Sequence, residues 1–268
     1  MTGLFDRELG QLQAAHLARH RRQVQPAVAP ADLAPHEEAL RATTYVIDGR
    51  TRLSFGSNDY LGLSQHPALL ASAHEAINRY GVGATASPLV CGHSPEHEAL
   101  ERELAERVGL PRALYFYAGY AANVGTVPAL VGRGDAIFSD ALNHACLIDG
   151  ARLAGCKLRR YPHADAEGAL RQLRTVPDGA AMLVTDGVFS MDGDLADLPA
   201  LCAEARSKGA WVMVDDAHGF GPLGATGGGI VEHFGLGIED VPVLVGTLGK
   251  GFGTAGAFVA GSEELIET

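Results

Sequence analysis

A lysine flanked by glycine on both sides is the residue in this sequence that most strongly indicates chemistry. Lys250 follows the apolar run Val243-Leu244-Val245 and lies between Gly249 and Gly251. Glycine allows other backbone to approach closely on both sides, where larger residues would clash. A lysine on the surface needs no such setting, whereas a lysine that bonds a flat aromatic aldehyde does. We therefore predict that Lys250 lies in a confined site.

A carboxylate and an imidazole precede this lysine at the end of another apolar run. Trp211-Val212-Met213-Val214 leads into Asp215, and His218 follows. These are groups that the ring of pyridoxal 5′-phosphate (PLP) needs, because a carboxylate that keeps the ring nitrogen protonated lets the ring accept electrons. A low-dielectric position at the end of a buried strand would strengthen that ion pair.

Further polar residues follow in an order that suits the same cofactor. His144 could contact the ring, and Ser190 and Thr247 could bind oxygen atoms of the cofactor. The backbone N–H groups of Gly119 and Tyr120, at the start of a predicted helix, could bind a phosphate. Each residue alone has an ordinary explanation, such as a helix cap or a polar loop. The complete order along the chain favours a cofactor site.

Composition and charge exclude several classes of protein. The 268 residues are 47% hydrophobic and include 34 glycines, which suits a compact enzyme rather than a disordered chain. A formal charge of −11 argues against binding to a nucleic-acid backbone. The basic cluster Arg19-His20-Arg21-Arg22 is predicted to lie on the solvated face of a helix. No apolar run is long enough to span a membrane.

The cysteines predict a reducing compartment and no metal centre. Cys91, Cys146, Cys156 and Cys202 form no C-x-x-C pair, and the N-terminus has no signal-peptide pattern. We therefore expect free thiols, no zinc site and a cytoplasmic protein.

Strands and helices are predicted to alternate from about residue 45 onward. The expected strands are 113–116, 136–138, 182–185, 211–214, 243–245 and 257–261, and the expected helices are 121–130, 145–153, 166–174 and 198–208. This alternation predicts a mostly parallel sheet with helices on both faces. Ligands of such sheets bind at the carboxyl ends of the strands, where Gly119, Ser139, Asp186, Asp215 and Thr247 fall.

The N-terminal part does not show this alternation of strands and helices. A helical spacing of leucines covers residues 3–23, and the prolines between Gln25 and Pro35 predict a linker. We therefore predict an N-terminal arm over residues 1–45 and a cofactor-binding domain over residues 46–268. The last residues, from Ser262 on, predict the start of a helix, so we expect the domain to continue beyond them.

Four segments resemble the α-oxoamine synthases, a family of fold-type I PLP enzymes. They are Ser57 to Leu63, Thr185 to Asp194, Val214 to Gly219 and Thr247 to Gly253. The resemblance implies an α/β large domain with a mostly parallel seven-stranded sheet and helices on both faces. It also implies a small C-terminal domain, which this chain does not include.

The resemblance implies a role for each matching residue. Lys250 would carry PLP and move the α-proton of the substrate, and Asp215 would pair with the ring nitrogen. His218 would bond the phenolic oxygen, and His144 would stack on the ring. The remaining assignments are Ser190 and Thr247 at the oxygens of the cofactor, Gly119 and Tyr120 at the phosphate, Asn58 at the carboxylate of the amino acid, and Arg21 or Arg22 at the acyl substrate.

The implied reaction is a decarboxylative condensation of an amino acid with an acyl thioester. L-Alanine and a pimeloyl thioester of CoA or of a carrier protein are the expected substrates, and a homodimer is the expected assembly. Other members remain open, namely glycine C-acetyltransferase, 5-aminolevulinate synthase and serine palmitoyltransferase. A more distant aminotransferase or lyase and a truncated homologue without catalysis also remain open.

Overall fold

The structure, a computed structural model, describes residues 2–27, 43–176 and 181–268. It divides into two compact units, Met1–Ser57 and Asn58–Thr268. The domain boundary predicted at residue 45 lies inside strand β2 (Thr44–Ile47). This strand pairs with a strand on each side. The first unit therefore continues past the predicted boundary.

The first unit consists of a helix and a small antiparallel sheet. Helix α1 spans Thr2–Ala14, and the sheet has the order β1-β2-β3, with β1 at Val24–Pro26 and β3 at Arg50–Leu53. Part of the predicted linker, Gln25 and Pro26, thus belongs to a strand. Residues 28–42 of that linker lie outside the described residues.

The prediction of a helix through residue 23 was wrong. His16 adopts a left-handed conformation with φ 55°. The Leu17 N–H then donates to the Leu12 carbonyl at 2.8 Å and the His16 N–H to the Gln13 carbonyl at 3.1 Å. These two bonds close the helix end in the manner of a Schellman motif. Arg21 and Arg22 consequently lie in the segment between α1 and β1, and not on a helix face as predicted.

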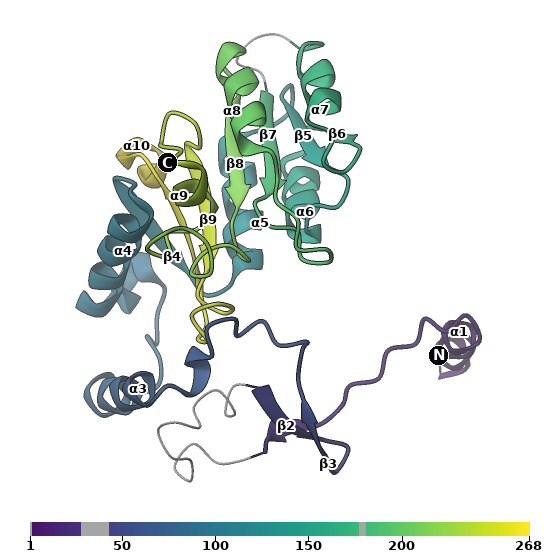
Figure 1. The fold of residues 1–268 in the computed structure, drawn as a ribbon, viewed down its shortest axis with the longest axis vertical. Helices are drawn as coiled ribbons and strands as arrows, with labels where there is room; N and C mark the ends of the chain where they lie inside the picture. The colour runs from purple at the N-terminus through teal and green to yellow at the C-terminus, as the bar shows by residue number, and fades with distance from the viewer. Residues whose placement is uncertain (1, 28–42, 177–180) are drawn as a thin grey trace. The chain divides into compact units, whose positions relative to one another are not determined.

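The second unit contains a seven-stranded sheet of order β4-β10-β9-β8-β7-β5-β6 (Figure 1). Strand β10 pairs antiparallel with both β4 and β9, and the other pairs are parallel. This confirms the mostly parallel sheet. The strands are β4 (Arg112–Phe116), β5 (Ala136–Asp140), β6 (Lys157–Tyr161), β7 (Ala181–Asp186), β8 (Trp211–Asp215), β9 (Val243–Thr247) and β10 (Ala257–Gly261).

Helices cover both faces of this sheet, as predicted. Successive residues of β7 point to opposite sides: Leu183 packs into a core with α4, α7 and α8, whereas Met182 and Val184 pack into a core with α5 and α6. The helices are α3 (Pro67–Tyr80), α4 (Pro95–Val108), α5 (Gly119–Leu130), α6 (Ala145–Ala154), α7 (Ala166–Leu173), α8 (Leu198–Ser207), α9 (Ile230–Phe234) and α10 (Glu263–Glu267). Across the described residues, each helix is too short or too polar to cross a membrane.

Strand β6 was not among the expected strands. Its sequence, Lys-Leu-Arg-Arg-Tyr, is polar because the strand lies at the sheet edge and pairs only with β5. Charged residues are common on such edges because they discourage pairing with other chains. A search for apolar runs therefore misses this strand.

Candidate active site

A cavity of about 180 Å³ lies at the carboxyl ends of β7, β8 and β9. The starts of α5 and α6 complete its wall, as expected for a ligand site of a parallel sheet. Its lining residues are Gly119, Tyr120, Asn123, His144, Cys146, Asp186, Asp215, Ala217, His218, Thr247 and Lys250. The structure thus brings together seven of the residues predicted for the cofactor: Lys250, Asp215, His218, His144, Thr247, Gly119 and Tyr120.

Lys250 and His218 are direct neighbours in this cavity. The Lys250 Nζ atom lies 2.7 Å from His218 Nε2. Burial lowers the pKa of Lys250, and the negative charges of Asp215 and Asp186 oppose that effect. Burial and the positive charge of Lys250 lower the pKa of His218 to about 4. At neutral pH the imidazole is therefore uncharged, and the amine loses its proton more readily than that of an exposed lysine.

Asp215 is held at the end of β8 by two donors. Its Oδ2 accepts a bond of 2.6 Å from Asn123 Nδ2, and its Oδ1 accepts a bond of 3.0 Å from the Ala217 N–H. The residue is only 6% exposed. These bonds fix the carboxylate within the cavity wall and offset part of its desolvation.

Sequence reasoning missed Asn123, which lies inside α5. The side chain is buried, and its Nδ2 also donates to Cys146 Sγ at 3.1 Å. An amide inside the otherwise apolar stretch Ala121 to Leu130 was a signal that could have found it. A polar side chain there is costly unless it has a hydrogen-bond partner, and the partner is Asp215.

His144 caps the start of α6 and contacts a thiol. Its Nδ1 accepts from the Cys146 N–H at 3.3 Å and lies 2.8 Å from Cys146 Sγ. Burial and the charge of Asp215 raise the pKa of Cys146 to about 12, so this thiol keeps its proton. The thiol can then donate to Nδ1, which leaves the Nε2 of His144 as the N–H nitrogen.

Two further aspartates are tied into the backbone near the cavity. Asp186 accepts from the His144 N–H at 3.0 Å, and burial together with the charge of Asp215 raises its pKa to about 8. Asp216 accepts from the Ile230 N–H at 2.7 Å and is 1% exposed. Asp216 thus anchors the loop that leads to α9.

The close approach of backbone predicted on both sides of Lys250 occurs on one side, at Gly251, and again further along at Gly253. A Cβ atom at Gly249 would meet only ordinary contacts of 3.6 Å or more, so the prediction was wrong there. At Gly251 it would lie 3.1 Å from the Phe220 carbonyl oxygen. At Gly253, where φ is 65°, it would lie 2.2 Å from the backbone nitrogen of Ser64. Gly253 therefore permits the contact between this loop and the segment that follows Leu61.

Thr247 ends β9 beside this loop. Its hydroxyl donates to the Gly256 carbonyl at 2.8 Å and accepts from the Gly249 N–H at 3.2 Å. Thr247 thereby shapes the turn that presents Lys250.

Ser190 does not line the cavity. It is exposed at the tip of the turn closed by the pairing of Val188 with Leu195. The Gly193 N–H donates to the Phe189 carbonyl at 2.9 Å, which tightens this turn and directs Ser190 outward. Its predicted contact with the cofactor therefore finds no support in its position.

Asn58 is connected to the cavity through another residue. Its Oδ1 accepts a bond of 3.3 Å from the Tyr60 hydroxyl, and that hydroxyl lies 2.6 Å from His218 Nδ1. Tyr60 was not among the predicted site residues. Arg21 and Arg22 belong to the other compact unit, where Arg22 lies 4.0 Å from Asp48, and their role at an acyl substrate stays a prediction.

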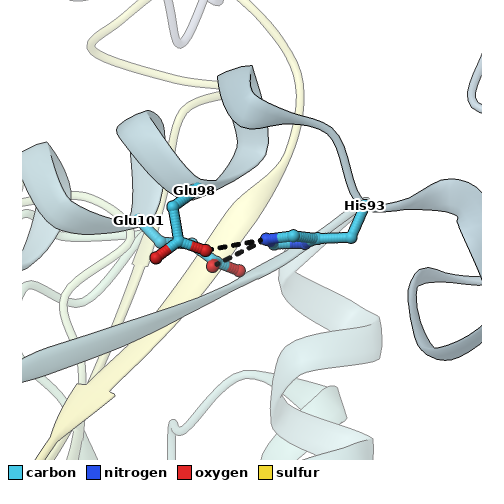
Figure 2. A group of neighbouring side chains, drawn as sticks. All are labelled: His93, Glu98 and Glu101. Atoms are coloured by element: carbon cyan, nitrogen blue, oxygen red, sulfur yellow. Dashed lines mark hydrogen bonds and ion pairs between the residues drawn. The ribbon is translucent and has the colours of Figure 1, made fainter.

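One group of metal-ligand type occurs outside the cavity within the described part of the chain: His93, Glu98 and Glu101 (Figure 2). His93 Nε2 lies 3.3 Å from a Glu98 oxygen and 3.8 Å from a Glu101 oxygen. The other oxygen of Glu101 accepts from the Tyr115 N–H at 2.9 Å. The group thus joins the start of α4 to β4, and we assign it this structural role.

Residues 50–268 match the family described as aminotransferase class I and II. The chain belongs to this family. Three similar proteins are 8-amino-7-oxononanoate synthases. That of Stutzerimonas stutzeri is 64% identical over 222 residues, which cover 83% of this chain and 56% of the relative. That of Pseudomonas aeruginosa strain LESB58 is 60% identical over 87% of this chain and 58% of the relative. That of Ectopseudomonas mendocina is 57% identical over 97% of this chain and 63% of the relative.

Solved structures of two enzymes show the same fold. A serine palmitoyltransferase from S. paucimobilis with bound PLP–myriocin aldimine has a TM-score of 0.86 and 30% identity, covering 99% of this chain and 64% of that one. The 8-amino-7-oxononanoate synthase of Francisella tularensis has a TM-score of 0.69 and 35% identity, covering 80% of this chain and 59% of that one. The resemblance to the α-oxoamine synthases is confirmed. The chain spans less than two thirds of the length of the curated relatives named above.

Proposed function

We propose that this chain is the cofactor-binding part of a PLP-dependent 8-amino-7-oxononanoate synthase of biotin biosynthesis. The whole protein would condense L-alanine with a pimeloyl thioester, of CoA or of a carrier protein, and release carbon dioxide and the free thiol. The observation that carries the proposal is the single cavity that combines Lys250, Asp215 and His218. The relatives at 57–64% identity support the choice of this member.

The residues around the cavity fit PLP. Lys250 supplies an amine for the aldehyde, and the buried Asp215 carboxylate, oriented by Asn123, suits a protonated ring nitrogen. The N-terminus of α5, at Gly119 and Tyr120, suits the phosphate because its backbone N–H groups have no helical partners. His144 and His218 line the cavity where they could contact the ring and its phenolic oxygen. When bound, PLP draws electrons from the α-carbon of the amino acid.

Lys250 has the properties of a base as well as of an anchor. Burial lowers its pKa, so more of the amine is neutral near pH 7 than for an exposed lysine. A neutral amine can remove a proton from the α-carbon of a substrate that it holds nearby. The uncharged His218 imidazole beside it can exchange hydrogen bonds with the amine without adding a second positive charge.

The assembly, the location and the remaining substrate contacts belong to the same proposal. We propose a homodimer in the cytoplasm, and the four free cysteines are consistent with a reducing compartment. Asn58 would contact the carboxylate of the amino acid, and Arg21 or Arg22 the acyl group. The part of the relatives' length that this chain does not span would complete the substrate site.

Reduction with borohydride tests the anchor. The sequence has three lysines, Lys157, Lys208 and Lys250, so the modified peptide is readily identified. We expect the reduced PLP adduct on Lys250, its loss in Lys250→Ala, and its retention in the exposed control Lys157→Ala. An adduct of equal yield in Lys250→Ala would refute the assignment.

The amino-acid specificity needs a separate titration. We expect the visible absorbance of the PLP-loaded protein to respond to L-alanine more strongly than to glycine or L-serine. A preference for L-serine would favour a serine palmitoyltransferase, the second candidate, which the structural similarity to the S. paucimobilis enzyme supports.

A further inference from the structure

A continuous row of hydrogen-bonding atoms connects Lys250 to Tyr60. The Lys250 amine lies 2.7 Å from His218 Nε2, and the other ring nitrogen, Nδ1, lies 2.6 Å from the Tyr60 hydroxyl. That hydroxyl in turn lies 3.3 Å from Asn58 Oδ1. Tyr60 is 44% exposed, whereas Lys250 lines the cavity. The row therefore runs from the cavity to a side chain in contact with solvent.

The direction of these bonds follows from what each group can donate. A protonated lysine only donates, so His218 Nε2 must accept, and the single proton of the neutral imidazole must be on Nδ1. Nδ1 then donates to the Tyr60 oxygen, which leaves the Tyr60 hydroxyl proton to be donated to Asn58 Oδ1. All four groups are satisfied by one consistent arrangement.

A second arrangement, with one proton fewer, satisfies Lys250, His218 and Tyr60 and releases Asn58 Oδ1 from the Tyr60 hydroxyl. If Lys250 is neutral, Nε2 can carry the imidazole proton and donate it to the amine. Nδ1 then accepts from the Tyr60 hydroxyl. The two arrangements differ by one proton and by the direction of the Tyr60 hydroxyl, so no heavy atom has to move.

The other ionisable groups around Lys250 are less suited to take its proton. Asp186 of β7 and Asp215 of β8 act on the amine through their charge, and Cys146 of α6 keeps its own proton. The Asp215 carboxylate accepts hydrogen bonds from the Asn123 side chain and the Ala217 N–H, and the Asp186 carboxylate accepts one from the His144 N–H. The Nδ1 of His144 is tied to Cys146. Within the described residues, the hydrogen bond of the amine is made to His218.

We propose that His218 and Tyr60 form a proton relay that carries the surplus proton of the Lys250 amine to solvent. The N–H bond of Lys250 breaks as Nε2 of His218 gains a proton. Nδ1 gives its proton to the Tyr60 oxygen, and the original Tyr60 hydroxyl proton passes to a water or buffer base. Lys250 is left neutral with a free electron pair, and His218 and Tyr60 each keep one proton. Asn58 orients the Tyr60 hydroxyl and keeps no proton.

The relay deepens the proposed function, on which it rests for the use made of the neutral amine. A protonated amine has no electron pair with which to attack an aldehyde or accept an α-proton. The relay itself is a property of the protein without cofactor, so it can be measured whether or not the catalytic assignment is correct.

The tautomer of His218 is the decisive measurement. We would label the histidines of the full chain with ¹⁵N, leave the cofactor out, and assign His218 among the 11 histidines from its loss in His218→Gln. The ¹⁵N chemical shift distinguishes a ring nitrogen that carries a proton from one that does not. Between about pH 6 and about pH 11, a range that includes the usual lysine pKa, we expect the proton to switch from Nδ1 to Nε2.

Tyr60→Phe should abolish this switch, because the variant lacks the hydroxyl that donates to Nδ1. Tyr80→Phe is the matched control: Tyr80 is 41% exposed and its hydroxyl donates to Glu96 Oε1 at 2.7 Å, on α3 rather than at the cavity. We expect the control to switch like the unmodified protein.

Two outcomes would overturn the proposal. One is a His218 tautomer that stays constant with pH in the unmodified protein, a result that needs no variant to fold. The other is an undiminished switch in Tyr60→Phe. If the switch is found but Lys250 forms no PLP adduct, the relay stands and the proposed function fails. If the adduct forms and the switch is absent, only the relay fails.

Discussion

Replacement of Gly253 by alanine tests how closely the Lys250 loop packs on the segment Leu63–Ser64. A Cβ atom at position 253 would lie 2.2 Å from the Ser64 nitrogen and 2.8 Å from the Leu63 carbonyl carbon, both of which are backbone atoms. The Gly253 N–H also donates to the Lys250 carbonyl at 2.9 Å, so a shift of Gly253 would displace the lysine. We expect Gly253→Ala to lose stability and PLP binding together.

Gly235 provides a control with nearly the same φ. Its φ is 66°, against 65° at Gly253, but a Cβ atom there would have no neighbour within 4 Å. Both alanines carry the cost of the left-handed conformation, about 1–2 kcal/mol. Only Gly253→Ala adds an overpacking cost, about 1–3 kcal/mol. The expected difference in unfolding free energy between the two variants is therefore about 1–3 kcal/mol.

Urea unfolding and thermal melts would measure this difference. At 2–4 °C per kcal/mol for a domain of about this size, the Tm of Gly253→Ala should be roughly 2–12 °C below that of Gly235→Ala. PLP binding, followed by visible absorbance, should survive in the control. Equal losses of stability in the two variants would refute the close contact between the two segments.

Two other measurements test the ionisation of buried groups. Burial raises the pKa of Asp216 to about 8, so the folded protein keeps a proton that the unfolded chain releases near pH 4, and stability should fall as pH rises from about 4 to about 8. Asp216→Asn should show a shallower fall in urea unfolding between pH 5 and pH 8, and parallel curves would contradict this. Alkylation of the native protein with iodoacetamide should modify the exposed Cys91 first. The buried Cys146 and Cys202, whose pKa values burial raises to about 12, should react only after unfolding, and mass spectrometry that finds native Cys146 modified as fast as Cys91 would contradict this.

The order of polar residues at the ends of apolar runs was enough to predict the centre of the site. Asp215 and Thr247 end neighbouring parallel strands. His218 follows Asp215 by three residues, and Lys250 follows Thr247 by three residues. Because the carboxyl ends of parallel strands meet at the same sheet edge, this local pattern implies that the residues are close in space. The resemblance in four segments added the family, and the comparisons confirmed it.

The contacts between distant segments were decided only by the tertiary structure. Asn123 reaches Asp215 across 92 residues, and Tyr60 reaches His218 across 158. The glycine that permits close approach is Gly253 rather than Gly249, because Ser64 happens to pack there. The outward position of Ser190, the end of α1 at Ala14 and the polar edge strand β6 likewise depend on turn geometry and pairing. Sequence spacing describes neighbours along one strand or helix, whereas packing between elements is selected by the free energy of the whole fold.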